Sequence, residues 1–165
     1  MGWTGEEKEK TVCFSGHRDM KESADKLESR LSETVKKLIE KGYTSFVTGG
    51  ARGFDTLAAE TVLKLKETYP VIRLVLILPF ERPYEHEKDW TNEEIKRYHE
   101  LIEKASGSVV LADGYKPGIY YRRNRYIVDM SSVCIAYLRR KNSGTAYTVD
   151  YAADHGLEIR NLALG

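Results

Sequence analysis

Short apolar runs alternate along the chain with longer segments in which apolar residues recur every three or four positions. The short runs have the length of strands, and their near-continuous apolarity is typical of parallel strands that are covered on both faces. Six such runs predict six strands, at residues 11–16, 44–50, 72–80, 108–113, 132–138 and 157–164.

The segments between these runs predict helices. The first apolar stripe extends from Leu27 to Ile39, and Gly42 is placed to end that helix. Residues 91–94, Thr-Asn-Glu-Glu, form a capping-box sequence, which predicts that a helix begins there. The same periodicity predicts the other helices, over residues 57–65, 119–130 and about 144–155.

Regular alternation of strands and helices predicts βαβ units, and therefore an α/β fold with a doubly wound, mainly parallel sheet. No internal repeat or linker interrupts the pattern, and residues 79–90 are its only irregular part. We therefore expect a single domain over residues 11–165, preceded by a solvated segment, residues 1–10.

Composition narrows the setting in which the domain acts. The chain has 165 residues and a formal net charge of +1, so its overall charge favours neither DNA nor a membrane. Cys13 and Cys134 lie within apolar runs, as buried thiols in a reducing compartment do. No apolar stretch has transmembrane length, and the four histidines lack metal-ligand spacing. These features predict a cytoplasmic protein that binds no metal.

Four of the predicted strands end in loops of small or charged residues. In a parallel sheet the carboxyl ends of the strands lie at one edge, where ligands bind. The loops are residues 15–18, 49–55, 113–115 and 142–145. The second and fourth open directly into helices, whose free amide groups attract anions, and arginines nearby add a fork for phosphate. A plain structural turn is the alternative for a glycine loop, because the sequence matches neither the P-loop nor the G-x-G-x-x-G pattern.

Several residues in these loops have a structural interpretation beside the functional one. Asp55 is either the N-cap of the following helix or a group that holds a ribose hydroxyl or orients Arg52. His17 is either a general acid or a side chain bonded to backbone. The tyrosines are candidates to stack on a base, although one of them lies on an apolar helical stripe. They are Tyr115, Tyr120 (the one on the stripe), Tyr121 and Tyr126. Without a nucleophile elbow or an obvious carboxylate pair, these residues favour binding over catalysis.

Four segments in this order resemble the SLOG superfamily of Rossmann-like domains, and within it the stand-alone YpsA-like branch. They are CFSGHR, GGARGFDTLAAE, RNRYIVDMS and SGTAYTVDYA, within residues 11–156. The resemblance implies a Rossmann-like sheet with strand order 3-2-1-4-5-6. It also implies a ligand that is a nucleotide or nucleotide derivative such as NAD, ADP-ribose or AMP.

The loops and the resemblance together give the predicted ligand-binding residues, with no catalytic and no metal-binding residue among them. They are Ser15, Gly16, His17, Arg18, Gly49, Gly50, Ala51, Arg52, Gly53, Asp55, Tyr115, Arg123, Asn124, Gly144 and Thr145. The chain departs from the YpsA-like pattern at Asp19, where proline is usual, and at Ser143, where the first of two glycines is usual.

The resemblance also frames the alternatives for function. A sensor or regulatory protein for a nucleotide, in bacterial stress or cell-division control, is the first expectation. Single-stranded DNA binding is the second, because DNA-processing protein A has close versions of two of the segments. The phosphoribohydrolases of the LOG type are the third, but Thr148 stands where they have a catalytic glutamate. The sequence leaves a protein partner and self-association open.

Overall fold

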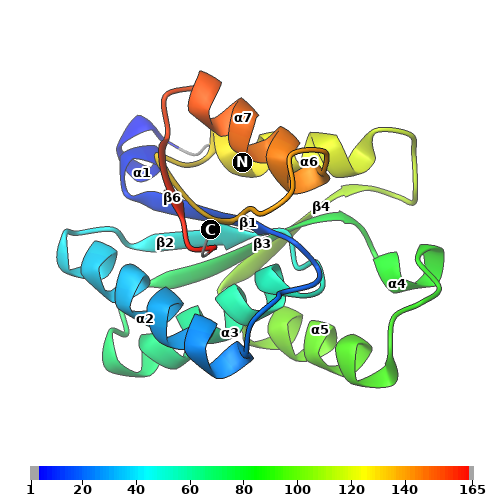
Figure 1. Cartoon of the computed structure of the whole chain (residues 1–165), viewed down its shortest axis with the longest axis horizontal. Coiled ribbons are helices and arrows are strands. Elements are labelled where there is room, and N and C mark those ends of the chain that lie inside the picture. Colours follow the sequence, from blue (N-terminus) through cyan, green and yellow to red (C-terminus); the bar gives the residue numbers. More distant parts are fainter. Residues whose placement is uncertain (1–3, 164–165) are drawn as a thin grey trace.

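A sheet of six strands, all parallel, forms the centre of the structure (Figure 1). The computed structural model describes residues 4–163; residues 1–3 and 164–165, at the ends of the predicted N-terminal segment and domain, lie outside it. The strands are β1 (Thr11–Gly16), β2 (Ser45–Thr48), β3 (Arg73–Phe80), β4 (Gly107–Ala112), β5 (Val133–Tyr137) and β6 (Glu158–Asn161). The predicted α/β class and the six strands are confirmed.

Helices cover both faces of the sheet, with α2, α3 and α5 on one side and α6 and α7 on the other (Figure 1). The helices are α1 (Gly5–Glu9), α2 (Ala24–Glu40), α3 (Phe54–Thr68), α4 (Pro83–His86), α5 (Asn92–Lys104), α6 (Ile119–Asp129) and α7 (Gly144–Asp154). The predicted capping box is present, since the Thr91 hydroxyl accepts from the Glu94 amide and the Glu94 carboxylate accepts from the Thr91 amide. Gly42 has a φ of +102°, the left-handed backbone expected just after a helix end.

Each helical layer has its own apolar core against the sheet. On the α2/α3/α5 side, Leu27, Leu31 and Phe46 are fully buried. On the other side, Cys134 of β5 packs with Ile127 and Val128 of α6. The alternation of side chains along each strand supplies both layers, and this explains why the strands read as continuous apolar runs.

The order of the strands is 4-3-2-1-5-6, so the expected order 3-2-1-4-5-6 is wrong. β4 pairs with β3 at the edge of the sheet, and β5 takes the place beside β1. The apolar content of the two strands, VCIAY in β5 and GSVVLA in β4, gives the physical reason, and burial reflects it. Every residue of β5 is buried, whereas β4 is only partly buried, with Val110 41% exposed. The more apolar strand therefore occupies the interior position, and the more exposed one forms the edge.

This order determines which loops can meet. The winding reverses between β1 and β5, so the loops after these two strands lie side by side at the switch point, next to the loop after β2. The loop after β4 instead begins at the edge of the sheet, because β4 pairs with β3 there and not with β1. No helix in the described part of the chain is long and apolar enough to cross a membrane.

Candidate ligand-binding site

Two adjoining cavities open at the switch point, at the carboxyl ends of the strands. The first has a volume of about 410 Å³ and the second of about 300 Å³. Gly16, Arg18, Ala51, Arg123 and Gly144 line both of them. Thus the loops after β1, β2 and β5, the start of α7 and Arg123 of α6 come together around one depression. Each volume lies within the range of small-molecule sites.

The glycines of these loops allow the loops to pack closely. Gly53 has a φ of +80°, and a Cβ atom there would collide with the backbone of Arg18. A Cβ atom on Gly16 would collide with the ring of Phe54 at the start of α3. In addition, the Phe54 amide donates to the His17 carbonyl oxygen at 3.2 Å. The loop after β2 is therefore locked against the loop after β1, and these two glycines are required by the fold.

Arg123 supports the glycine loop from α6. Its side chain is buried; Nη1 donates to the carbonyl oxygen of Gly49 at 2.8 Å, and Nε donates to Oδ1 of Asn124 at 2.8 Å. Burial lowers the pKa of the guanidinium, against the opposing pull of Asp55. A Cβ atom on Gly49 would lie 2.6 Å from Nη1. Two of the Arg123 nitrogens are thus committed to the protein, and its role is to hold the loop.

Asp55 is not the N-cap of α3; that interpretation is wrong. Gly53 occupies the N-cap, and Asp55 lies in the first turn with 7% of its surface exposed. Burial raises its pKa to about 7, although Arg123 and the amides of Ala51 and Gly16 favour the carboxylate. Its Oδ1 atom has no hydrogen-bond partner among the described residues. Asp55 lines the second cavity, so a carboxyl group with a pKa near neutrality lies at the wall of that cavity.

His17 connects two loops. Its ring is buried, and Nε2 accepts from the backbone amides of Arg139 at 2.8 Å and Arg140 at 3.2 Å. Because Nε2 accepts twice, it carries no proton, and burial together with Arg140 lowers the pKa of the ring. Of the two interpretations of His17, this contact with backbone is the one that the structure displays.

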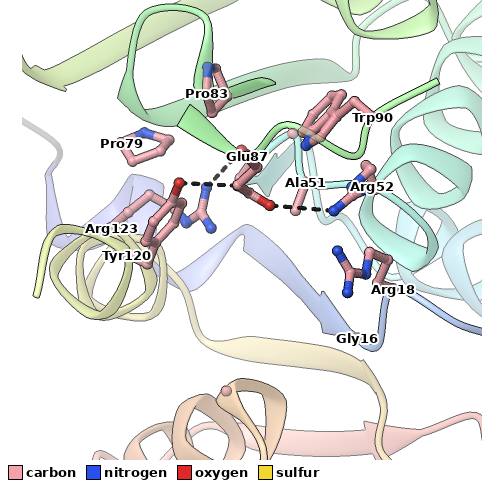
Figure 2. A pocket seen from close by; sticks show the side chains of 13 residues that line it. Gly16, Arg18, Ala51, Arg52, Pro79, Pro83, Glu87, Trp90, Tyr120 and Arg123 are labelled. Atoms are coloured by element: carbon pink, nitrogen blue, oxygen red, sulfur yellow. Dashed lines mark hydrogen bonds and ion pairs between the residues drawn. The ribbon is translucent and has the colours of Figure 1, made fainter. Parts of the chain in front are cut away.

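Arg52 is paired with acids of residues 79–90, the segment that looked irregular in the sequence. Its guanidinium donates to Asp89 Oδ1 at 3.1 Å. It also donates to Glu87 Oε1 at 3.5 Å and lies 5.2 Å from the centre of the Trp90 ring (Figure 2). Asp89 also pairs with Arg18 at 3.4 Å. Contrary to the expectation that Arg52 is a ready phosphate ligand, its donors already face carboxylates.

Glu87 and Asp89 were missed as site residues. The available signal was the position of their segment, which follows β3 at the ligand-binding edge and carries several charges. Glu87 lines the first cavity, and its Oε2 accepts from the Tyr120 hydroxyl at 3.0 Å (Figure 2). The carboxylates of the chain therefore shape this end of the site as much as its arginines do.

The start of α7 borders both cavities. The Ser143 hydroxyl accepts from the Ala146 amide at 3.1 Å as the helix cap, and Thr145 lines the second cavity with Ser143. A Cβ atom on Gly144 would meet nothing within 4 Å, so the backbone of this residue faces open space. Thr148 is buried and donates to the Gly144 carbonyl oxygen at 3.0 Å.

The remaining predicted residues divide between the site and its surroundings. Ser15 and Asn124 line the second cavity, and Gly50 lines the first. Gly53 and Tyr115 line neither cavity, and Tyr115 stacks on His86 with ring centres 4.0 Å apart. Tyr115 follows β4, and the changed strand order explains its removal from the switch point. The described residues contain no group of three His, Cys, Asp or Glu side chains able to hold a metal ion.

A family model and proteins of similar sequence agree on the family to which this chain is related. The model of the YspA SLOG family (YpsA) matches residues 9–161. A UPF0398 protein of Halalkalibacterium halodurans is 30% identical over 76% of this chain and 67% of its own length. The SPbeta prophage-derived protein YoqJ of Bacillus subtilis is 29% identical over 77% of this chain and 80% of its own. The SLOG resemblance of the sequence is thereby confirmed.

Solved structures share the fold at low sequence identity. DNA processing protein A of Helicobacter pylori, whose structure concerns single-stranded DNA binding, superposes with a TM-score of 0.63 at 20% identity, covering 90% of this chain and 63% of that protein. The Streptococcus pneumoniae protein of the same name gives 0.64 at 17% identity, covering 93% and 50%. This chain thus spans half to two thirds of those proteins.

Proposed function

The chain belongs to the YspA SLOG family, and on that premise we propose that it binds a nucleotide-type ligand and acts as a sensor or regulatory protein. The observation that carries the proposal is the meeting of three loops and the start of α7 around two joined cavities. Backbone amides at a helix start favour an anion, and Arg18, with a side chain 59% exposed, adds a positive charge at the same place.

The ligand that suits this geometry carries one compact anionic group. A phosphate at Gly144 and Thr145 faces the α7 amino terminus, beside the Ser143 hydroxyl that caps the helix at the Ala146 amide. Arg18 borders both cavities and reaches the same group from the loop after β1. The rest of the ligand extends into the larger cavity, toward Trp90 and Tyr120, whose rings offer apolar surface to a base.

Calorimetric titration and thermal shift with AMP, ADP-ribose and NAD test the proposal. We expect at least one of them to raise the melting temperature at millimolar concentration, because a ligand that binds only the native state stabilises it. The Arg18→Gln variant should weaken binding about tenfold, as the loss of one charge-assisted contact does. Lys64→Gln, a comparable charge removal on α3 with a 67% exposed side chain, is the control. If none of the three compounds binds the unaltered protein, the proposal fails.

Single-stranded DNA binding is a second candidate because of one surface feature. Tyr121 and Tyr147 are 46% and 36% exposed with ring centres 4.6 Å apart, and Arg125 donates to the Tyr147 hydroxyl at 2.9 Å. Exposed aromatic rings beside arginine are typical of surfaces on which bases stack. The structural neighbour from Helicobacter pylori is described as binding single-stranded DNA, which supports the same reading.

Fluorescence anisotropy with a labelled oligothymidine at low and moderate salt tests this candidate. Binding that falls steeply with salt and is lost in Tyr121→Ala would support it. An unchanged anisotropy at low salt would refute it. Because the nucleotide proposal depends on Arg18 and the DNA candidate on Tyr121, the two variants distinguish them.

A further inference from the structure

The first cavity has two ends with different electrical character. Around Arg52, whose side chain is only 5% exposed, three carboxylates lie within 4 Å: Asp89 at 3.1 Å, Glu87 at 3.5 Å and Glu94 at 3.8 Å. The Asp89 carbonyl oxygen takes a further hydrogen bond from Arg52 at 3.2 Å. Arg18 also lies 3.4 Å from Asp89, and of these three acids Glu87 is the one that lines the cavity, so Glu87 presents the carboxylate that can receive hydrogen-bond donors at this end.

Glu87 is held at this end by three separate elements. It follows α4, where its amide donates to the Pro83 carbonyl oxygen at 2.9 Å. Its Oε2 atom accepts from Tyr120 of α6 and its Oε1 atom from Arg52 of the loop after β2 (Figure 2). A carboxylate can accept about four hydrogen bonds, and these contacts use one on each oxygen. The side chain remains 33% exposed, so the other acceptor positions are available to the cavity that Glu87 lines.

Glu87 is not needed to neutralise Arg52. Asp89 lies nearer to the guanidinium and contacts it through both its carboxylate and its backbone oxygen. Asp89 thus gives the arginine a charged partner of its own, and Glu87 is a second acid, held by a tyrosine hydroxyl, whose charge also attracts the buried Arg123. Such an arrangement is explained if the second acid has a ligand to receive.

From these contacts we infer that Glu87 recognises a pair of neighbouring hydroxyl groups, and that the ligand is therefore a ribose phosphate with both ring hydroxyls free. Two carboxylate oxygens match two adjacent O–H donors, and charge-assisted bonds of this kind are the stronger ones. The anionic group then lies at the α7 end and the diol at the Glu87 end. This inference rests on the proposed nucleotide binding and specifies its ligand class.

Titration of the protein with AMP and with 2′,3′-dideoxy-AMP tests the inference without any variant. We expect the dideoxy compound to bind at least about tenfold more weakly, because two hydrogen bonds to a charged group are lost. In Glu87→Gln the affinity for AMP should fall by a similar factor while that for dideoxy-AMP stays the same, so the preference disappears. Glu85→Gln, which changes a 59% exposed acid on α4, the short helix that Glu87 follows, should retain it.

The outcomes separate this inference from the proposal on which it rests. Equal affinity of the unaltered protein for AMP and dideoxy-AMP overturns the role of Glu87 and leaves nucleotide binding standing. No binding of AMP, ADP-ribose or NAD overturns both. A preference for AMP that persists in Glu87→Gln shows that another group reads the hydroxyls, and it also overturns the assignment.

Discussion

Asp55→Asn should remove the free-energy cost of ionising a buried carboxyl group, which lowers the stability of the native protein at neutral pH. The unfolded chain releases the Asp55 proton near the ordinary pKa of 3.8, whereas the buried carboxyl holds it up to about 7. Between these values the native state binds more protons than the unfolded state. The contribution of Asp55 to stability is therefore greatest at acidic pH, declines as pH rises through this interval, and levels off above pH 7.

The size of the effect follows from the same two values. A shift of about 3 pKa units corresponds to roughly 4 kcal/mol, at about 1.36 kcal/mol per unit. At pH 5 about 1.6 kcal/mol of this penalty is already present, so the loss between pH 5 and pH 8 is about 2.6 kcal/mol. Asparagine has nearly the same shape and does not titrate. The free energy of unfolding of the variant, minus that of the unaltered protein, should increase by about 2 to 3 kcal/mol from pH 5 to pH 8.

Urea unfolding of both proteins at the two pH values measures this difference. Other titrating groups cancel in the comparison. His17 is one of them, and its effect has the opposite sign: its pKa is lowered in the native state, so its contribution is lost as pH falls below the ordinary value near 6.5. Asp154→Asn, at the exposed end of α7, controls for removal of a surface carboxylate. A difference between Asp55→Asn and the unaltered protein that stays constant within about 0.5 kcal/mol would refute the reasoning.

Two further predictions concern the loops. Gly53→Ala should destabilise the protein by at least about 2 kcal/mol in urea unfolding, because φ is +80° and the new methyl group would collide with the loop after β1. The control, Gly144→Ala, lies at an unobstructed position and should change the free energy of unfolding by less than about 0.5 kcal/mol. Similar losses in both variants would contradict the packing argument. Asp89→Asn should bind AMP several-fold more tightly in calorimetry, because it removes the carboxylate that pairs with Arg18, while Arg52 keeps Glu87 and Glu94. Weaker or equal binding would show that the Arg18–Asp89 pair does not compete with the ligand.

Local patterns were sufficient for the elements of this fold but not for their order. The capping box at Thr91 and the stop at Gly42 act through neighbouring backbone, so the sequence displays them directly. Whether β4 pairs with β3 or β1 depends on comparing the burial of two strands far apart in the chain. The exposure of Val110 in β4 and the full burial of β5 reflect the outcome, and they exist only once the sheet has formed.

The candidate site shows the same division. Sequence placed the glycine loops at the correct edge, because strands that end in glycine before a helix can be read locally. It could not tell that Arg52 faces acids located 35 and 37 residues later, or that Arg123 reaches back to the Gly49 carbonyl oxygen across 74 residues. The local sequence around an arginine beside a glycine loop is the same whether its guanidinium is free to bind a phosphate or is already paired with other groups of the protein.

The acids of residues 79–90 change what the pocket can select. With Arg52 and Arg123 committed to the protein, Arg18 is the arginine lining the first cavity whose side chain is mostly exposed, and it too touches Asp89. A polyanion such as nucleic acid gains little from such a site, because its affinity increases with each phosphate neutralised. A ligand with one phosphate and several hydroxyl donors gains at both ends. The proposed binding mode therefore favours a small ribose phosphate over a nucleic-acid strand within the pocket, and leaves the surface near Tyr121 as the place where a strand would have to bind.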